Sequence, residues 1–228
     1  MNKEWQERTE QLIGQEGIMH LKGKKVLVAG IGGVGGSCVE ALARSGIGTI
    51  GIIDKDIIEP SNLNRQIFAT EDTLGMSKVK AAEERLAKIN PQAKIQSYDC
   101  FYQDLSEREK LISGYDYVVD AIDDIKGKIA LIKDSFDMKI PIVSAMGMGN
   151  RMNPLMLYEA DIYETQYCPL AKSVRKGLRD LGILSLKVVY SKEECIKMHP
   201  PGTMAFVPNS CGLALASIVV RDLLKEIL

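Results

Sequence analysis

A glycine-rich turn between an apolar strand and a helix is the feature that most restricts how this chain can fold. The run Gly30-Ile31-Gly32-Gly33-Val34-Gly35 follows an apolar segment at 26–29 and leads into a helix-like stretch at 38–43. A second apolar segment, 50–53, ends at Asp54. A strand, a glycine turn, a helix and an acid at the next strand end are typical of a nucleotide-binding βαβ unit.

The turn also predicts the chemistry of the pocket. Glycines allow the backbone to approach phosphate oxygens closely, and a helix N-terminus offers free N–H groups and partial positive charge. We expect Asp54 to accept hydrogen bonds from ribose hydroxyls. The glycines that we expect to contact the nucleotide are Gly30, Gly32, Gly33 and Gly35.

Strand-like and helix-like segments alternate along the chain, which predicts an α/β fold. We expect a Rossmann-like, doubly wound, mostly parallel sheet with helices on both faces. Further strands are expected at 95–98, 117–120 and 141–145, and helices at 78–89, 126–137, 169–181 and 211–227. Residues 1–228 are interpreted as a single domain. It has an N-terminal helical segment over 1–22 and a crossover, substrate-side region over 150–210, with loop or crossover around 150–168 and a basic helix at 169–181.

The segment after Asp54 indicates a nucleotide with more charge than a dinucleotide. A helix N-terminus contributes only about half a positive charge, which suits a pyrophosphate better than a triphosphate. Arg65 and Lys78 are candidates for the missing cations, and Asn62 and Gln66 for orienting phosphate or ribose oxygens. The alternative is that Arg65 and Lys78 are ordinary surface charges.

Two carboxylates follow the apolar run 117–122, at the expected carboxyl end of another strand. Ligands of open parallel sheets lie at that edge, so Asp123 is a candidate ligand of Mg²⁺ beside the phosphates. The alternative for Asp123 is a helix N-cap, a role that Asp124 fits better. Asp56 either assists the metal or shapes the turn.

A basic helix face is expected in the last third of the chain. Lys172, Arg175, Lys176 and Arg179 have the spacing i, i+3, i+4 and i+7. Four cations without an intervening acid repel each other, so a phosphate-rich partner would stabilise them. The alternative is a solvated helix face. The net charge of −1 argues against indiscriminate nucleic-acid binding, so any RNA contact has to come from this local patch.

Together these motifs resemble the adenylating superfamily of ubiquitin-activating enzymes and bacterial sulfur-carrier activators, the ThiF, MoeB and HesA proteins. The resemblance rests on the glycine turn, Asp54, the segment 62–66, Lys78 and the Asp120-x-x-Asp123 pair. It implies an enzyme that binds Mg-ATP, joins a carboxylate to the α-phosphate and releases pyrophosphate. It also implies that Asp54 holds the ribose and Asp123 the Mg²⁺. The residues implied to surround the phosphates are Asn62, Arg65, Gln66 and Lys78.

Further segments resemble one branch, the tRNA threonylcarbamoyladenosine dehydratases. They are 8–14, 169–172, 188–191 and 202–208. Members activate the threonyl carboxylate of a modified adenosine beside the tRNA anticodon, and loss of AMP closes a ring. The alternative is an adenylating activator of a ubiquitin-like sulfur-carrier protein. Such activators commonly hold zinc with two Cys-x-x-Cys pairs, and the five cysteines of this sequence form no such pair.

The same resemblance implies a homodimer in which Arg8 reaches the partner's phosphates; the alternative is a surface ion pair with Glu4 or Glu7. A sulfur-relay partner, the substrate atom that closes the ring and an acyl-accepting role for Cys168 are left open. Scattered cysteines and no secretion signal predict a reducing cytoplasm. The uncharged stretch 200–220 contains prolines and glycines, which favours a buried turn and a core helix over a membrane span.

Overall fold

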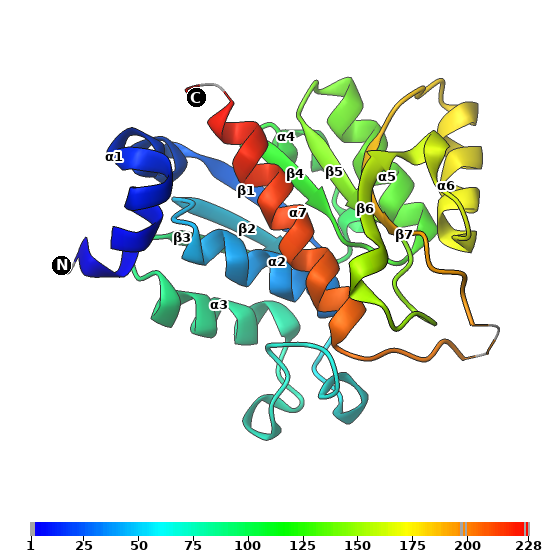
Figure 1. The fold of residues 1–228 in the computed structure, drawn as a ribbon, viewed down its shortest axis with the longest axis horizontal. Helices are drawn as coiled ribbons and strands as arrows, with labels where there is room; N and C mark the ends of the chain where they lie inside the picture. Colours follow the sequence, from blue (N-terminus) through cyan, green and yellow to red (C-terminus); the bar gives the residue numbers. More distant parts are fainter. Residues whose placement is uncertain (1–2, 197, 199, 226, 228) are drawn as a thin grey trace.

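One seven-stranded sheet organises the protein in the computed structural model, which describes residues 3–196, 198, 200–225 and 227 (Figure 1). The strand order is β3-β2-β1-β4-β5-β7-β6, and all pairs are parallel except β6 with β7. This arrangement confirms the predicted doubly wound α/β fold. The strands are β1 (Lys25–Ala29), β2 (Thr49–Ile53), β3 (Lys94–Tyr98), β4 (Tyr117–Asp120), β5 (Ile142–Ala145), β6 (Leu157–Asp161) and β7 (Lys187–Ser191).

Alternating strand side chains feed two hydrophobic clusters, one on each face of the sheet. In β1, Val26 and Val28 belong to one cluster, and Leu27 and Ala29 to the other. Strands buried on both faces need continuous apolar runs, which is the pattern that predicted them. The order of the strands reverses beside β1, between β2 and β4, and open α/β sheets bind ligands at such a point.

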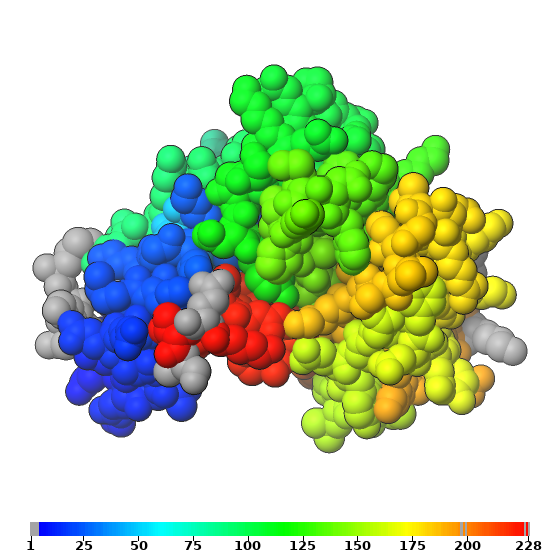
Figure 2. All heavy atoms as spheres, turned by 90° about the horizontal axis from the view of Figure 1, so that it is seen from above, coloured from blue at the N-terminus to red at the C-terminus, as the bar shows by residue number. Residues whose placement is uncertain are grey.

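The helices divide between the two faces. Those that contribute to the first cluster are α1 (Glu7–Gly23), α2 (Gly33–Arg44), α3 (Lys78–Ile89) and α7 (Phe206–Leu224). Those that contribute to the second are α4 (Arg108–Ile112), α5 (Ile125–Asp137) and α6 (Pro169–Asp180). Viewed from above, α7 lies between the N-terminal helix and the segments that follow β5 (Figure 2).

The region 150–168, expected to be loop or crossover, also contains the edge strand β6 at residues 157–161, which the sequence analysis did not predict. Tyr158 and Glu159 on this strand are exposed, so its sequence lacks the apolar run that marks the inner strands. Its antiparallel register with β7 pairs Leu157 with Ser191 and Asp161 with Lys187. That long-range pairing, which no local pattern reveals, makes the segment a strand.

The helix α7 begins five residues before the expected start at 211. Pro208 lies in its first turn, where a missing N–H does no harm. The helix approaches α2 so closely that a Cβ at Gly212 would lie 2.2 Å from the carbonyl oxygen of Val34. By length and composition alone α7 could cross a membrane, but 56% of its most apolar stretch is buried inside the protein.

The N-terminal segment is helical over residues 7–23, with a break at Gly14, where φ is +71°. Leu12, an apolar residue of this segment, is 84% exposed. Among the helix residues that the structure describes, only Gly17 and Leu21 are buried. The segment therefore packs through a smaller surface than its apolar pattern predicts.

Candidate active site

A cavity of about 510 Å³ opens at the carboxyl ends of β1, β2 and β4. Nine of the eleven residues expected to serve catalysis or nucleotide binding line it. They are Gly30, Gly32, Gly33, Asp54, Asn62, Arg65, Gln66, Lys78 and Asp123. Parallel strands bring their carboxyl ends to one edge, and this is why motifs far apart in sequence meet here.

The glycine turn fits tightly against β4 on one side and is open to the cavity on the other. Gly30 has φ of +87°, and a Cβ there would lie 2.6 Å from the carbonyl oxygen of Ala121. A Cβ at Gly35 would lie 1.7 Å from the carbonyl oxygen of Gly30, so Gly35 shapes the turn without lining the cavity. At Gly32 the nearest atom to a Cβ is 3.9 Å away. Gly32 and Gly33 both line the cavity, so the N-terminus of α2 borders it.

Asp54 is positioned by backbone N–H groups of its surroundings. Its carboxylate accepts from Ile31 at 2.6 Å and from Asp56 at 2.8 Å, so it also fixes the glycine turn. Burial raises the pKa of Asp54, and the nearby Lys78 ammonium and the two N–H donors offset only part of that effect. A carboxylate has about four acceptor positions, which leaves capacity for ribose hydroxyls.

Lys78 is a buried cation at the first position of α3, with a side chain only 9% exposed. Its Nζ lies 2.6 Å from a carboxylate oxygen of Asp56 and 3.9 Å from one of Asp54. Asp56 is 59% exposed, and its backbone oxygen also accepts from the Lys78 N–H. Asp56 therefore shapes this turn and balances the charge of Lys78.

The segment after β2 presents three further polar side chains to the cavity. Arg65 donates from Nη1 to the Ser61 carbonyl and to the Asn64 side chain, both at 2.8 Å. Asn62 is buried and accepts from the Glu59 N–H, which closes a short capping box. Gln66 is only 7% exposed and lies next to Gly32. These contacts hold the segment against the glycine turn.

The two adjacent carboxylates after β4 have different surroundings. Asp124 caps α5 by accepting from the Gly127 N–H at 2.7 Å. Asp123, like Asp124, is exposed and lines the cavity, but it does not cap the helix. Among the described residues, no three His, Cys, Asp or Glu side chains form a metal cage. One carboxylate together with phosphate oxygens and water is a donor set that suits Mg²⁺, so Asp123 fits such a metal.

A buried ion pair behind the cavity was missed by sequence reasoning. Lys128 and Asp120 are both fully buried, with Nζ 2.7 Å from the carboxylate. Lys128 also donates to Ser144 and to the Ala145 carbonyl, and Asp120 accepts from the Ile122 N–H. This network fixes the turn against which Gly30 packs. A strand-end acid followed eight residues later by a lysine was the only sequence signal for it.

The wall opposite the glycine turn was also missed. It consists of Met148, Gly149, Pro201, Gly202 and Thr203. Asn150 joins its two loops, because its side chain accepts from the Gly202 N–H at 2.7 Å. The Asn64 side chain ties the second loop to the segment after β2 by donating to the Thr203 carbonyl at 2.9 Å. The cavity thus depends on contacts between segments far apart in the chain.

Arg8 does not line the cavity of its own chain. It lies exposed on α1, where Nη1 donates to Gln11 at 3.4 Å. Cys168 is buried at the start of α6, where its sulfur accepts from the Ala171 N–H, and it does not line the cavity either.

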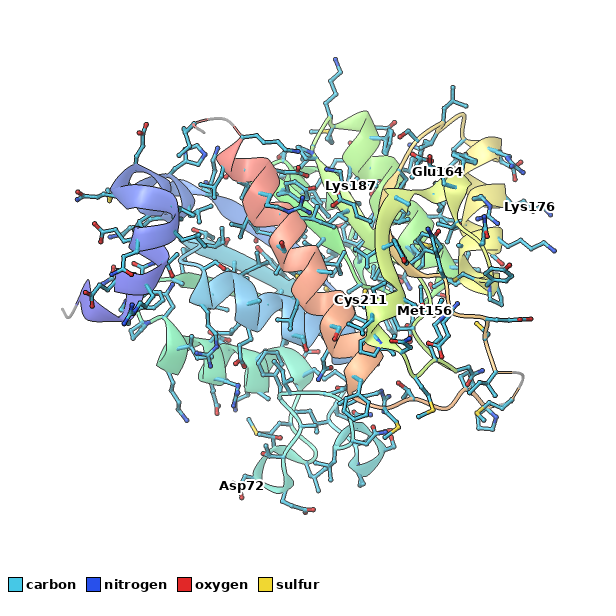
Figure 3. The ribbon with its side chains drawn as sticks, viewed as in Figure 1. Asp72, Met156, Glu164, Lys176, Lys187 and Cys211 are labelled. Atoms are coloured by element: carbon cyan, nitrogen blue, oxygen red, sulfur yellow. The ribbon has the colours of Figure 1, made fainter. Side chains whose placement is uncertain are left out.

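The four cations of α6 are not equivalent. Lys172 and Lys176 are exposed, and Lys176 points away from the body of the protein (Figure 3). Arg175 is half-buried and donates to the carbonyls of Ile162 and Thr165. Arg179 stacks over the ring of Tyr163 at 5.5 Å. Three of the four are therefore exposed, and Arg175 alone is held against the preceding turn.

The sequence and the fold of this chain are similar to those of tRNA-modifying proteins. A tRNA threonylcarbamoyladenosine dehydratase of Bacillus subtilis is 39% identical over 96% of this chain and 94% of its own length. The Escherichia coli protein of the same name is 35% identical over 88% of this chain and 79% of its own length. The solved structure of the E. coli dehydratase TcdA in complex with AMP has a TM-score of 0.92 and 31% identity. The match with the AMP complex covers 99% of this chain and 97% of the TcdA chain. The structure of TcdA in complex with ATP has a TM-score of 0.91.

The model of the ThiF family matches residues 6–226, nearly the whole sequence. The chain belongs to the ThiF family.

Proposed function

We propose that this protein is an ATP-dependent dehydratase of threonylcarbamoyladenosine in tRNA. The observation that carries the proposal is one cavity that joins a glycine turn, Asp54 and two cations, in a chain similar over almost its full length to dehydratases of that name. The reaction begins when the threonyl carboxylate attacks the α-phosphate of ATP. Pyrophosphate leaves, and an acyl-adenylate forms.

In this proposal the nucleotide lies along the glycine turn. The N–H groups at the start of α2 bind phosphate oxygens, since Gly32 leaves that side open. Asp54 accepts hydrogen bonds from the ribose. Arg65 and Lys78 neutralise the phosphates, and Asn62 and Gln66 orient them. Positioned charges of this kind account for most of the catalysis in phosphoryl chemistry.

Lys78 would have to exchange one partner for another during binding. It now contacts Asp56, which is exposed and so remains hydrated when the lysine leaves. The phosphates of ATP compete for Lys78 more strongly than Asp56 does, because together they carry more negative charge than one carboxylate. Mg²⁺, when bound, would neutralise the leaving pyrophosphate, and Asp123 is the carboxylate that would hold it.

Ring closure needs no nucleophile from the enzyme. The carbamoyl group that attacks belongs to the same side chain as the activated carboxyl, and AMP is the leaving group. Effective molarities of intramolecular steps reach about 10⁵ M or more in favourable cases. The net change is loss of one water from the nucleoside, with AMP and pyrophosphate as the other products.

We also propose a cytoplasmic homodimer in which Arg8 reaches the cavity of the partner. This is supported by its exposed position away from its own cavity and by five free cysteines, as expected in a reducing compartment. A concentration series in sedimentation tests the dimer. Mixing inactive Arg8→Ala with inactive Lys78→Ala tests the shared site, since only complementation across the interface restores activity.

The function is tested by incubating the protein with ATP, Mg²⁺ and tRNA that bears threonylcarbamoyladenosine. After digestion, the nucleoside should weigh less by one water, and AMP should accumulate in equal amount. An unchanged nucleoside mass would refute the proposal. If instead the protein adenylates only a carrier ending in Gly-Gly, it is an activator of a sulfur carrier.

A further inference from the structure

Tyr167 is an exposed aromatic residue in a backbone conformation that bulky residues rarely adopt. Its φ is +53°, and 57% of its surface is exposed. An L-residue with a side chain of this size is an outlier in the left-handed region. Such a conformation persists only where the surroundings impose it, and strained residues of this kind cluster at functional sites.

Two arginines fix the segment that presents Tyr167. Arg175 of α6 donates to the carbonyls of Ile162 and Thr165. Arg151, only 3% exposed, donates to the Tyr167 carbonyl at 2.9 Å. These contacts use the backbone and leave the ring free. The backbone of this segment is thus held by hydrogen bonds, while Tyr167 itself is exposed.

The backbone of Tyr167 is linked by short connections to both the cavity wall and the basic helix. Arg151 also donates to the carbonyl of Gly149, which lines the cavity. On the other side, Tyr167 directly precedes Cys168, the N-cap of the helix that exposes Lys172 and Lys176. One arginine therefore connects the cavity wall to Tyr167, and one residue connects Tyr167 to α6.

We propose that Tyr167 is a stacking platform for an unpaired base of the tRNA loop that carries the modified adenosine. This rests on the proposed function. Proteins recognise single-stranded RNA loops largely by stacking splayed bases on aromatic rings, with cations on the backbone beside them. The modified nucleoside enters the cavity, a neighbouring base stacks on Tyr167, and Lys172 and Lys176 contact the phosphates.

The test measures the dissociation constant of the protein for tRNA that bears threonylcarbamoyladenosine, at several salt concentrations. Tyr167→Ala should raise that constant about 5- to 100-fold, the range for loss of one base–aromatic stack. Tyr167→Phe and Tyr167→Trp should bind like the original protein. The slope of log affinity against log salt should not change, because no phosphate contact is removed.

Two further variants separate stacking from a structural role. Phe136→Ala removes an aromatic of 40% exposure near the end of α5. This residue lies just before the amino end of β5, whereas the cavity lies at the carboxyl ends of the strands, so the variant should leave tRNA affinity unchanged. Tyr167→Gly relieves the left-handed backbone, so it should unfold at the same or a higher temperature while binding tRNA as weakly as Tyr167→Ala.

Unchanged tRNA affinity in Tyr167→Ala would overturn the platform, and so would parallel losses of stability, ATP affinity and tRNA affinity in both the alanine and glycine variants. In either case an original protein that still removes water from the nucleoside leaves the proposed function intact. An original protein that neither binds nor dehydrates this tRNA contradicts the proposed function itself.

Discussion

At the scale of single residues, residues close together in the chain have separate roles because their surroundings differ. Asp124 caps a helix, whereas Asp123 remains free beside the cavity. Gly30 is required by backbone geometry, whereas Gly32 leaves space for a ligand. Each pair provides a variant that tests folding and a matched variant that tests function.

The carboxylate pair gives the first prediction. Asp124→Ala should lower the free energy of unfolding by about 1 kcal/mol, the usual effect of losing an N-cap, and should keep activity. Asp123→Ala should leave stability within about 0.5 kcal/mol, because an exposed side chain is removed. It should abolish most Mg²⁺-dependent turnover. Urea unfolding and AMP release measure the two effects, and the opposite pattern would exchange the two roles.

The second prediction concerns Gly30 and Gly32. Gly30→Ala should destabilise the fold by about 2 kcal/mol or more, because its φ is positive and its Cβ would collide with the Ala121 carbonyl. Gly32→Ala should fold normally but bind ATP about tenfold more weakly, since its methyl group occupies the phosphate side of the turn. Calorimetry of ATP binding distinguishes them. Normal ATP affinity in Gly32→Ala would place the phosphates elsewhere.

At the scale of elements, α6 combines a structural arginine with exposed lysines. Arg175 binds carbonyls of the preceding turn, so Arg175→Ala should lower the free energy of unfolding by about 1–3 kcal/mol. Lys172→Ala with Lys176→Ala should leave stability nearly unchanged. That double variant should weaken tRNA binding and reduce its salt slope by about 1–2, since each phosphate contact contributes about 0.7–0.9. Equal losses of ATP and tRNA affinity would contradict a specific RNA role.

At the scale of the whole molecule, Asp222 ties the end of α7 to two strands at the edge opposite the cavity. Burial alone would raise the pKa of its carboxyl, but hydrogen bonds from Lys187, Lys225 and Tyr117 lower it to about 2. A lowered carboxyl pKa stabilises the folded state above the unfolded pKa, near 4, and that stabilisation is lost as pH falls toward 2.

This linkage gives the last prediction. The original protein should lose about 2 kcal/mol of stability through this group between pH 4 and pH 2. Asp222→Asn should be less stable at pH 7 and should show a smaller loss over that acidic range. Thermal unfolding at pH 7, 4 and 2.5 measures the difference. If both proteins lost stability to the same extent over this pH range, Asp222 would not be responsible for the pH dependence.

The sequence by itself determined the strands β1 to β5, the glycine turn and nine residues of the cavity, whereas the inner strand β7 was not predicted. It could do so because buried parallel strands have continuous apolar runs, and because the motifs that follow them converge at one edge. Only the tertiary structure decided that 157–161 is a strand, that Lys128 and Asp120 form a buried pair, and that Arg175 fixes a turn. Those features depend on hydrogen bonds between distant segments, and local spacing carries no information about which distant partner completes them.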